Sequence, residues 1–200
     1  GAGQMLKHLA AAGVEPAQIN AVVISHFHPD HIFGLMSKAP ENRPTFPNAQ
    51  ILVPAAEYGF WMDPAGIEKM PAGRQPLARR IQEMFPLLKD RVRPFQGDQE
   101  ILPGIRPVDA PGHTPGHTAF HLSSGSDQLL VLGDVTNIPA LFVRNPGWQA
   151  AFDQDPGLAE ATRRQMLERA AAERIRVAGY HFPFPATGTI AKDGNGYVFT

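Results

Sequence analysis

Three of the eight histidines in this 200-residue sequence fall within one six-residue run, His-Phe-His-Pro-Asp-His at residues 26–31. The run follows residues 21–25, whose apolar and β-branched side chains predict a short buried strand. His26 and His28 lie at positions i and i+2 after that strand, so their side chains point the same way. Two such imidazoles are suited to bind one metal ion.

Asp30 and His31 leave the same turn in another direction, as ligands for a second ion. Three further candidate ligands each follow an apolar strand: His113 in a Pro-Gly-His motif, Asp134 in a Gly-Asp motif, and His181 after Gly-Tyr. A strand-end aspartate taken alone is as well explained as a helix cap or turn residue. Four strand ends that all present such residues predict a metal site on one edge of a sheet, with Asp134 between two metals.

The absence of cysteine excludes disulfides, thiolate zinc sites and cysteine nucleophiles. Histidine and carboxylate without thiolate are typical of catalytic zinc and are acceptable to iron, manganese or cobalt. We therefore expect two divalent metal ions, with Zn²⁺ as the first choice. A surface histidine cluster is the alternative, and the position of the run after a buried strand disfavours it.

The His-x-His-x-Asp-His run, the Pro-Gly-His-Thr-Pro-Gly-His sequence at 111–117, the Gly-Asp pair and the last histidine together resemble the metallo-β-lactamase superfamily. Within it, the similarity is to the methyl parathion hydrolase and acyl-homoserine lactone lactonase group. The resemblance runs from about Leu9 to Phe199. It implies an α+β fold, a four-layer αββα sandwich with a dinuclear site between its sheets, formed by residues 1–200 as a single domain.

The resemblance also implies which residue binds which metal. One metal is expected on His26, His28 and His113, and the other on Asp30, His31 and His181, with Asp134 bridging them. Two cations about 3.5–4 Å apart hold a hydroxide whose pKa is near 7. That hydroxide is expected to attack a lactone, ester or phosphotriester, while Asp30 passes a proton to the leaving group.

Aromatic residues on loops near these motifs suggest an apolar pocket for a small, neutral substrate. The candidate pocket residues are Phe27, Phe33, Phe142, Trp148 and Phe182. His117 is expected to hydrogen-bond a ligand or its strand rather than to bind metal.

Two departures from the family pattern stand out. The chain starts at Gly1 without the strands that usually precede the first helix, so we expect an incomplete or short N-terminal sheet. Phe33 stands where many lactonases have glycine, which predicts a narrowed or reshaped site mouth.

Residue periodicity supports alternating strands and helices. The predicted helices are 4–12, 55–62, 75–90 with a break at Pro86, and 156–174. The predicted strands are 21–25, 50–53, 105–109, 118–122, 128–132 and 175–179, with a closing hairpin at 190–199.

A formal net charge of −1 without a basic run argues against nucleic-acid binding. No apolar stretch reaches the ~20 residues that cross a membrane, and the sequence shows no signal peptide. We expect a soluble protein of the cytoplasm or periplasm, two compartments between which a cysteine-free chain does not discriminate. The resemblance also suggests a homodimer.

Other functions fit the motifs less well. A β-lactam-hydrolysing enzyme of this fold commonly lacks one or more of the seven ligands. A catalytically weak metal-binding member would also have lost ligands. A di-iron redox enzyme would have glutamate in place of His28, together with a flavin domain, and a nuclease would need a basic surface.

Overall fold

The computed structural model describes residues 3–38 and 40–200, so Gly1 and Ala2, at the expected shortened start, lie outside it. The chain divides into two compact units, Gly1–Phe95 and Gln96–Thr200. Each unit has its own sheet and hydrophobic core, and the single domain over 1–200 stays a prediction. No helix in the described part is both long and apolar enough to cross a membrane.

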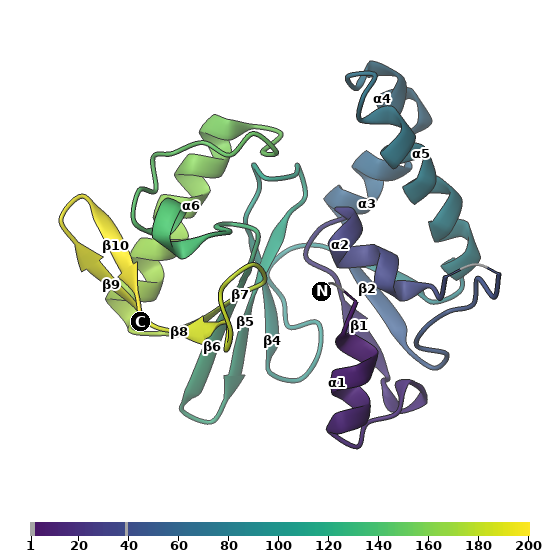
Figure 1. Ribbon diagram of the computed structural model, residues 1–200, viewed down its shortest axis with the longest axis horizontal. Coiled ribbons are helices and arrows are strands. Elements are labelled where there is room, and N and C mark those ends of the chain that lie inside the picture. Colours follow the sequence, from purple (N-terminus) through teal and green to yellow (C-terminus); the bar gives the residue numbers. More distant parts are fainter. Residues whose placement is uncertain (1–2, 39) are drawn as a thin grey trace. The chain divides into compact units, whose positions relative to one another are not determined.

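The first unit is a small parallel sheet with helices between its strands (Figure 1). Its elements are α1 (Met5–Ala11), η1 (Pro16–Gln18), β1 (Ala21–Val23), α2 (Pro29–Ile32), η2 (Phe33–Leu35), β2 (Gln50–Pro54), α3 (Ala55–Met62), α4 (Pro64–Lys69), α5 (Gln75–Met84), η3 (Phe85–Leu88) and β3 (Val92–Phe95). The strand order is β1-β2-β3, and both pairings are parallel. Parallel neighbours need crossover connections, which is why helices α3 to α5 separate β2 from β3.

Helix α5 shows how this core forms. Ala78, Ile81 and Met84 recur at helical spacing and are buried with Ile51 and Val53 of β2. The α-helix ends at Met84, and a 3-10 turn containing Pro86 continues to Leu88. The predicted break at Pro86 is confirmed, because proline cannot continue the α-helical hydrogen bonding.

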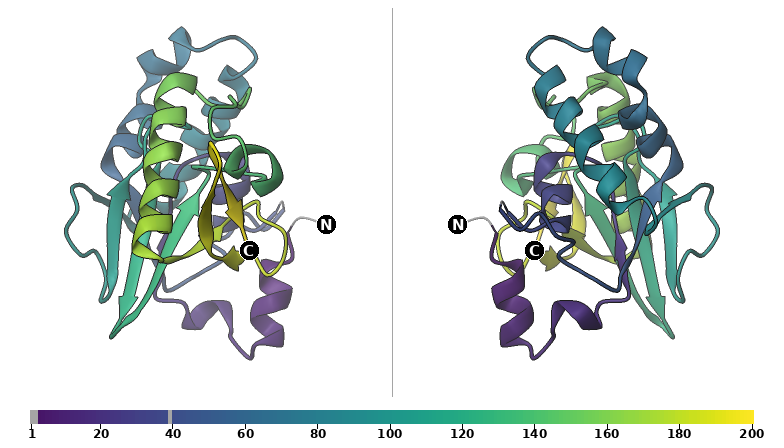
Figure 2. Two further views of the ribbon diagram at one scale, coloured as in Figure 1. Left: turned by 90° about the vertical axis from the view of Figure 1, so that its left-hand side faces the viewer. Right: turned by 90° about the vertical axis from the view of Figure 1, so that its right-hand side faces the viewer.

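The second unit is a five-stranded sheet with one long helix and a hairpin on it. Its elements are β4 (Ile105–Asp109), β5 (Thr118–Ser124), β6 (Asp127–Gly133), the π-helix η4 (Pro139–Val143), α6 (Pro156–Glu173), β7 (Arg176–Gly179), β8 (Thr187–Gly188), β9 (Ile190–Asp193) and β10 (Gly196–Phe199). Figure 2 shows α6 and the β9–β10 hairpin side by side. Leu167 of α6 and Tyr197 of β10 belong to one core with Leu130 and Val177 of the sheet.

The strand ends that carry candidate ligands belong to two sheets. Strand β5 runs antiparallel to both β4 and β6, and β7 runs parallel to β6. The carboxyl ends of β4, β6 and β7 therefore meet at one edge, as predicted for His113, Asp134 and His181. The prediction of one sheet edge is wrong for residues 26–31, because β1 pairs with β2 in the separate three-stranded sheet.

Gly112 explains the glycine of the Pro-Gly-His motif. Its φ is +124°, and a Cβ atom there would collide with the backbone of Ala159 in α6. The amide N–H of Asp155, the N-cap residue of α6, donates to the Gly112 carbonyl over 2.9 Å. The turn that carries His113 is thus packed directly on the first turns of α6.

We expect Gly112→Ala to destabilise the protein by roughly 2–5 kcal/mol, because it combines a disfavoured φ with a backbone collision. Urea unfolding monitored by circular dichroism measures the loss.

Gly125→Ala in the β5–β6 turn is the matched control. Its φ is +61°, but nothing lies within 4 Å of the added methyl group, so only the conformational cost of about 1–2 kcal/mol applies. Equal losses in the two variants would show that contact with α6 does not constrain Gly112.

Candidate metal centre

The histidine run of the first unit begins where strand β1 leaves its sheet. The N–H of Ile24 still donates to the carbonyl of Leu52 over 2.9 Å, and the chain then turns away. Side chains alternate through the following residues, so the buried ring of Phe27 enters the core while His26 and His28 share the other side. His26 Nε2 lies 3.1 Å from His28 Nδ1.

The short helix α2 redirects the rest of the run. Pro29 occupies its first turn, where its missing N–H costs no hydrogen bond. The turn brings the imidazole of His31 to 4.0 Å from that of His26, measured between ring centroids. His31 Nε2 lies 3.5 Å from Asp30 Oδ2, and the Asp30 side chain is 48% exposed.

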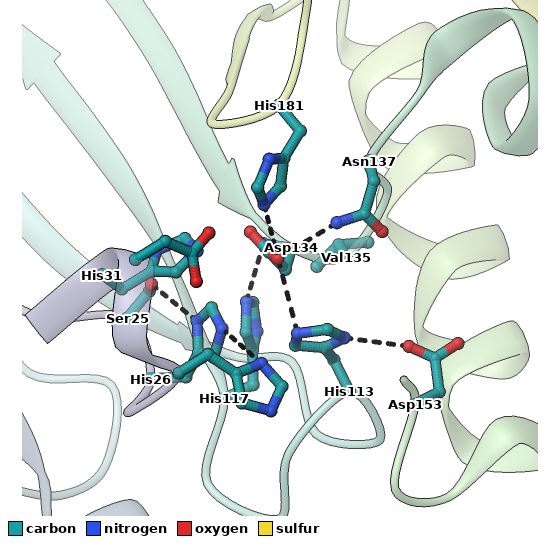
Figure 3. Close-up of polar contacts among 12 residues, drawn as sticks. Ser25, His26, His31, His113, His117, Asp134, Val135, Asn137, Asp153 and His181 are labelled. Atoms are coloured by element: carbon teal, nitrogen blue, oxygen red, sulfur yellow. Dashed lines mark hydrogen bonds and ion pairs between the residues drawn. The ribbon is translucent and has the colours of Figure 1, made fainter. Parts of the chain in front are cut away.

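In the second unit, Asp134 is the residue to which the other polar side chains converge (Figure 3). Its Oδ2 atom lies 3.0 Å from His181 Nε2, 3.0 Å from Asn137 Nδ2 and 3.4 Å from His113 Nε2. A shift in the β6–β7 register and a φ of +55° at Gly133 precede it. Such an irregularity re-aims the side chain that follows a strand.

His117 holds the backbone of Asp134. Its Nδ1 lies 3.1 Å from the carbonyl oxygen of Ala110, which can only accept, so Nδ1 carries the proton. The other nitrogen, Nε2, therefore accepts the Asp134 N–H over 2.9 Å. Both ring nitrogens of His117 are thus used within the second unit to fix Asp134.

His113 lies between two carboxylates (Figure 3). Its Nδ1 is 2.9 Å from Asp153 Oδ1, and a carboxylate can only accept, so Nδ1 carries the proton. In the neutral ring, Nε2 then turns a lone pair toward Asp134 Oδ2, 3.4 Å away. The lone pairs of His113 Nε2 and Asp134 Oδ2 repel each other at this distance unless a cation or a proton lies between them. Both atoms can donate a lone pair to a metal ion, so their arrangement fits a metal site.

The donor set of each unit consists of imidazole nitrogens and carboxylate oxygens. This combination suits Zn²⁺ and other first-row divalent ions. The partner of His113 fits the same interpretation, because metal-binding histidines usually donate their other N–H to a carboxylate or carbonyl.

The model of the metallo-β-lactamase superfamily matches residues 1–178. The chain belongs to this superfamily. The predicted metallo-β-lactamase fold and the recognition of its family are therefore confirmed. A comparison with curated proteins finds no match.

Several solved structures are similar to the chain. One is AidC, a dizinc quorum-quenching lactonase in complex with a product, N-hexanoyl-L-homoserine; it is 28% identical, with a TM-score of 0.91 over 99% of this chain and 69% of that chain. A second is AbOPH, a hydrolase in the β-lactamase superfamily; it is 27% identical, with a TM-score of 0.89 over 98% and 69%. A probable metal-dependent hydrolase from Staphylococcus aureus, 23% identical with a TM-score of 0.80 over 99% and 68%, shows the same fold. The chain is thus a hydrolase of the metallo-β-lactamase superfamily.

The five candidate pocket aromatics fall into two groups by burial: two are buried and three are at least partly exposed. Phe27 is fully buried and stacks on Phe85 with 4.3 Å between ring centroids, and Phe182 is buried against Phe199. These two rings form part of the cores of their units, and their assignment as pocket walls stays a prediction. Alternation along the chain explains Phe27, since it points opposite to His26.

The other three pocket candidates are partly or largely exposed. The guanidinium carbon of Arg80 lies 4.5 Å from the centroid of the Phe33 ring, and that of Arg163 lies 5.2 Å from the Phe142 centroid. Trp148 is 54% exposed. Phe33 also packs against the core of the first unit. The contact of Phe33, Phe142 and Trp148 with a substrate stays a prediction.

Glu57 is a buried residue that the sequence motifs did not reveal. It lies in α3, and its Oε1 accepts the Phe27 N–H over 2.9 Å and the Trp61 indole N–H over 2.6 Å. The backbone between His26 and His28 is therefore held by a carboxylate from another element. A lone acidic residue in an otherwise apolar helical run was the one available signal.

We expect Glu57→Ala to lower the free energy of unfolding by about 2–4 kcal/mol, because it removes the acceptor of two buried N–H groups. Glu57→Gln keeps an acceptor oxygen and is expected to lose less. Chemical denaturation monitored by Trp61 fluorescence measures both variants. Glu68→Ala, on the exposed face of α4, is the control and should change stability by less than about 0.5 kcal/mol; a Glu57→Ala variant as stable as this control would contradict the role.

Proposed function

We propose that the protein is a dizinc hydrolase that opens lactones or related neutral, apolar esters. The observation that carries the proposal is the arrangement of His113 and Asp134, whose acceptor atoms face each other at 3.4 Å as metal ligands do. The likeness to the dizinc lactonase AidC, at 28% identity over 99% of this chain, supports the substrate class.

The proposed ligands come from both units and follow the order of the family motifs. One ion is assigned to His26, His28 and His113, and the other to Asp30, His31 and His181, with Asp134 shared. The donor chemistry within each unit supports this assignment, and the buried hydrogen bonds of Glu57, His117 and Asp153 support the orientation of the ligands.

Bound divalent ions supply a water of lowered pKa and a Lewis acid for the scissile carbonyl. The residues of the chain do the rest. Asn137 and the backbone contact from His117 hold Asp134 in one orientation. As water adds to the acyl carbon, the half-exposed carboxylate of Asp30 accepts a proton from that water, and it passes this proton to the leaving oxygen when the ring C–O bond breaks.

The substrate is proposed to be neutral and partly apolar. Phe33, Phe142 and Trp148 offer aromatic surface for an acyl or aryl group. Phosphotriesters and aryl esters share these properties and are the second candidates.

The direct test is ring opening of a long-chain N-acyl-homoserine lactone by the zinc-loaded protein, measured as proton release. We expect a rate well above background that is abolished by a chelator and restored by zinc. A protein that retains two zinc ions but opens no lactone would contradict the lactonase proposal, and phosphotriesters and aryl esters would then be assayed.

Asp134→Ala tests the shared ligand. We expect this variant to lose bound metal, measured by elemental analysis, and to lose activity by more than about 100-fold, since ligand orientation alone is worth 10–100-fold. Asp127→Ala, on the exposed end of the β5–β6 hairpin, is the control and should keep both. Full activity in Asp134→Ala would refute the assignment.

A further inference from the structure

The geometry points to Arg163 as a positioning residue that links the ligand His113 to the chain segment carrying Phe142 and Trp148. The inference rests on the proposed function only for the roles of these three residues. The contacts that carry it lie within the second unit.

The guanidinium of Arg163 is buried in the second unit and satisfies four acceptors. Arg163 lies in α6, and its side chain is only 1% exposed although it is long and charged. It donates to the Val135 carbonyl over 3.0 Å, to the Pro146 carbonyl over 3.0 Å, to the Trp148 carbonyl over 2.7 Å and to Asp153 Oδ2 over 3.3 Å. Burying such a cation lowers the stability of the fold unless the cation is paired and fully hydrogen-bonded.

The charge of Arg163 is matched by Asp153, and Asp153 connects it to His113. Burial lowers the pKa of Arg163, and the nearby carboxylate of Asp153 acts in the opposite direction. The second carboxylate oxygen of Asp153 accepts the His113 Nδ1–H over 2.9 Å. Arg163 thereby keeps Asp153 turned toward His113 with Nε2 of the ring pointing to Asp134.

The same guanidinium also anchors the connection between β6 and α6. Val135 directly follows Asp134, while Pro146 and Trp148 lie beyond η4, whose Phe142 ring faces the guanidinium at 5.2 Å. One side chain thus contacts the start, the middle and, through Asp153, the end of this connection. The position of Trp148 and the orientation of His113 are therefore coupled through Arg163.

Two variants test separately the contact of Arg163 with the Trp148 segment and the orientation of His113 by Asp153. Arg163→Lys keeps a positive charge near Asp153 but lacks the planar fork that reaches several acceptors at once. Asp153→Asn keeps the size of the side chain but removes the charge that orients His113. Arg169→Lys, which alters an arginine paired with Glu173 on the same helix, is the matched control.

For Asp153→Asn we expect zinc affinity, measured by competition with a chromophoric chelator, to fall about 10–100-fold. For Arg163→Lys we expect the KM of a long-chain lactone to rise at least about fivefold with a smaller change in kcat, as for lost substrate binding. The fluorescence anisotropy of Trp148 in a Trp61→Phe background should fall in Arg163→Lys and stay unchanged in Arg169→Lys.

The inference is overturned if Arg163→Lys leaves the anisotropy of Trp148 at the control value, or if Asp153→Asn binds zinc as tightly as the unmodified protein. A general loss of stability would lower the melting temperature without changing the KM-to-kcat split. If the unmodified protein opens no lactone, the proposed function fails, whereas zinc competition and Trp148 anisotropy still decide the role of Arg163.

Discussion

A carboxylate can be buried only where donors reach it, and this requirement organises both sets of candidate ligands. Glu57, Asp134 and Asp153 are all buried. Glu57 accepts the backbone N–H of Phe27 in the histidine run. Asp134 accepts a hydrogen bond from the Asn137 side chain, and Asp153 pairs with the buried guanidinium of Arg163. Since an unpaired buried carboxylate would cost several kcal/mol, the hydrogen bonds that satisfy Glu57 and Asp153 also fix the backbone of the histidine run and the ring of His113.

The candidate ligands could be singled out in the sequence because their signal is local. Alternation places His26 and His28 on one side of the chain, and a strand before each motif brings the residue to a sheet edge. Helices α1, α3, α5 and α6 and the main strands followed in the same way from periodicity, and α5 ends at Met84, just before Pro86. The short helices α2 and α4 were not predicted. Side-chain alternation and helical periodicity thus predict an element correctly where its structure depends on residues close in the sequence.

His117 was predicted to hydrogen-bond a ligand or its strand, and it accepts the N–H of Asp134. Glu57 and Asp153 could not be predicted as supporting residues, because their partners are distant in the sequence. Asp153 lies 40 positions from His113, and Glu57 lies 30 from Phe27. No spacing rule relates such residues, and only the packing of α3 or α6 brings them together. The same limit explains the sheet error, since hydrogen bonding between β1 and β2, rather than strand order, decides which sheet a strand joins.

The parallel pairing of β6 and β7 has a consequence for the order of assembly. Parallel strands can pair only after the connection between them has crossed the sheet, and here that connection contains η4 and the whole of α6. The contact between Asp134 and His181 therefore forms late, after a costly loop closure. A cation held by this pair would stabilise the folded state relative to the unfolded one, because the two side chains meet only when the crossover is closed.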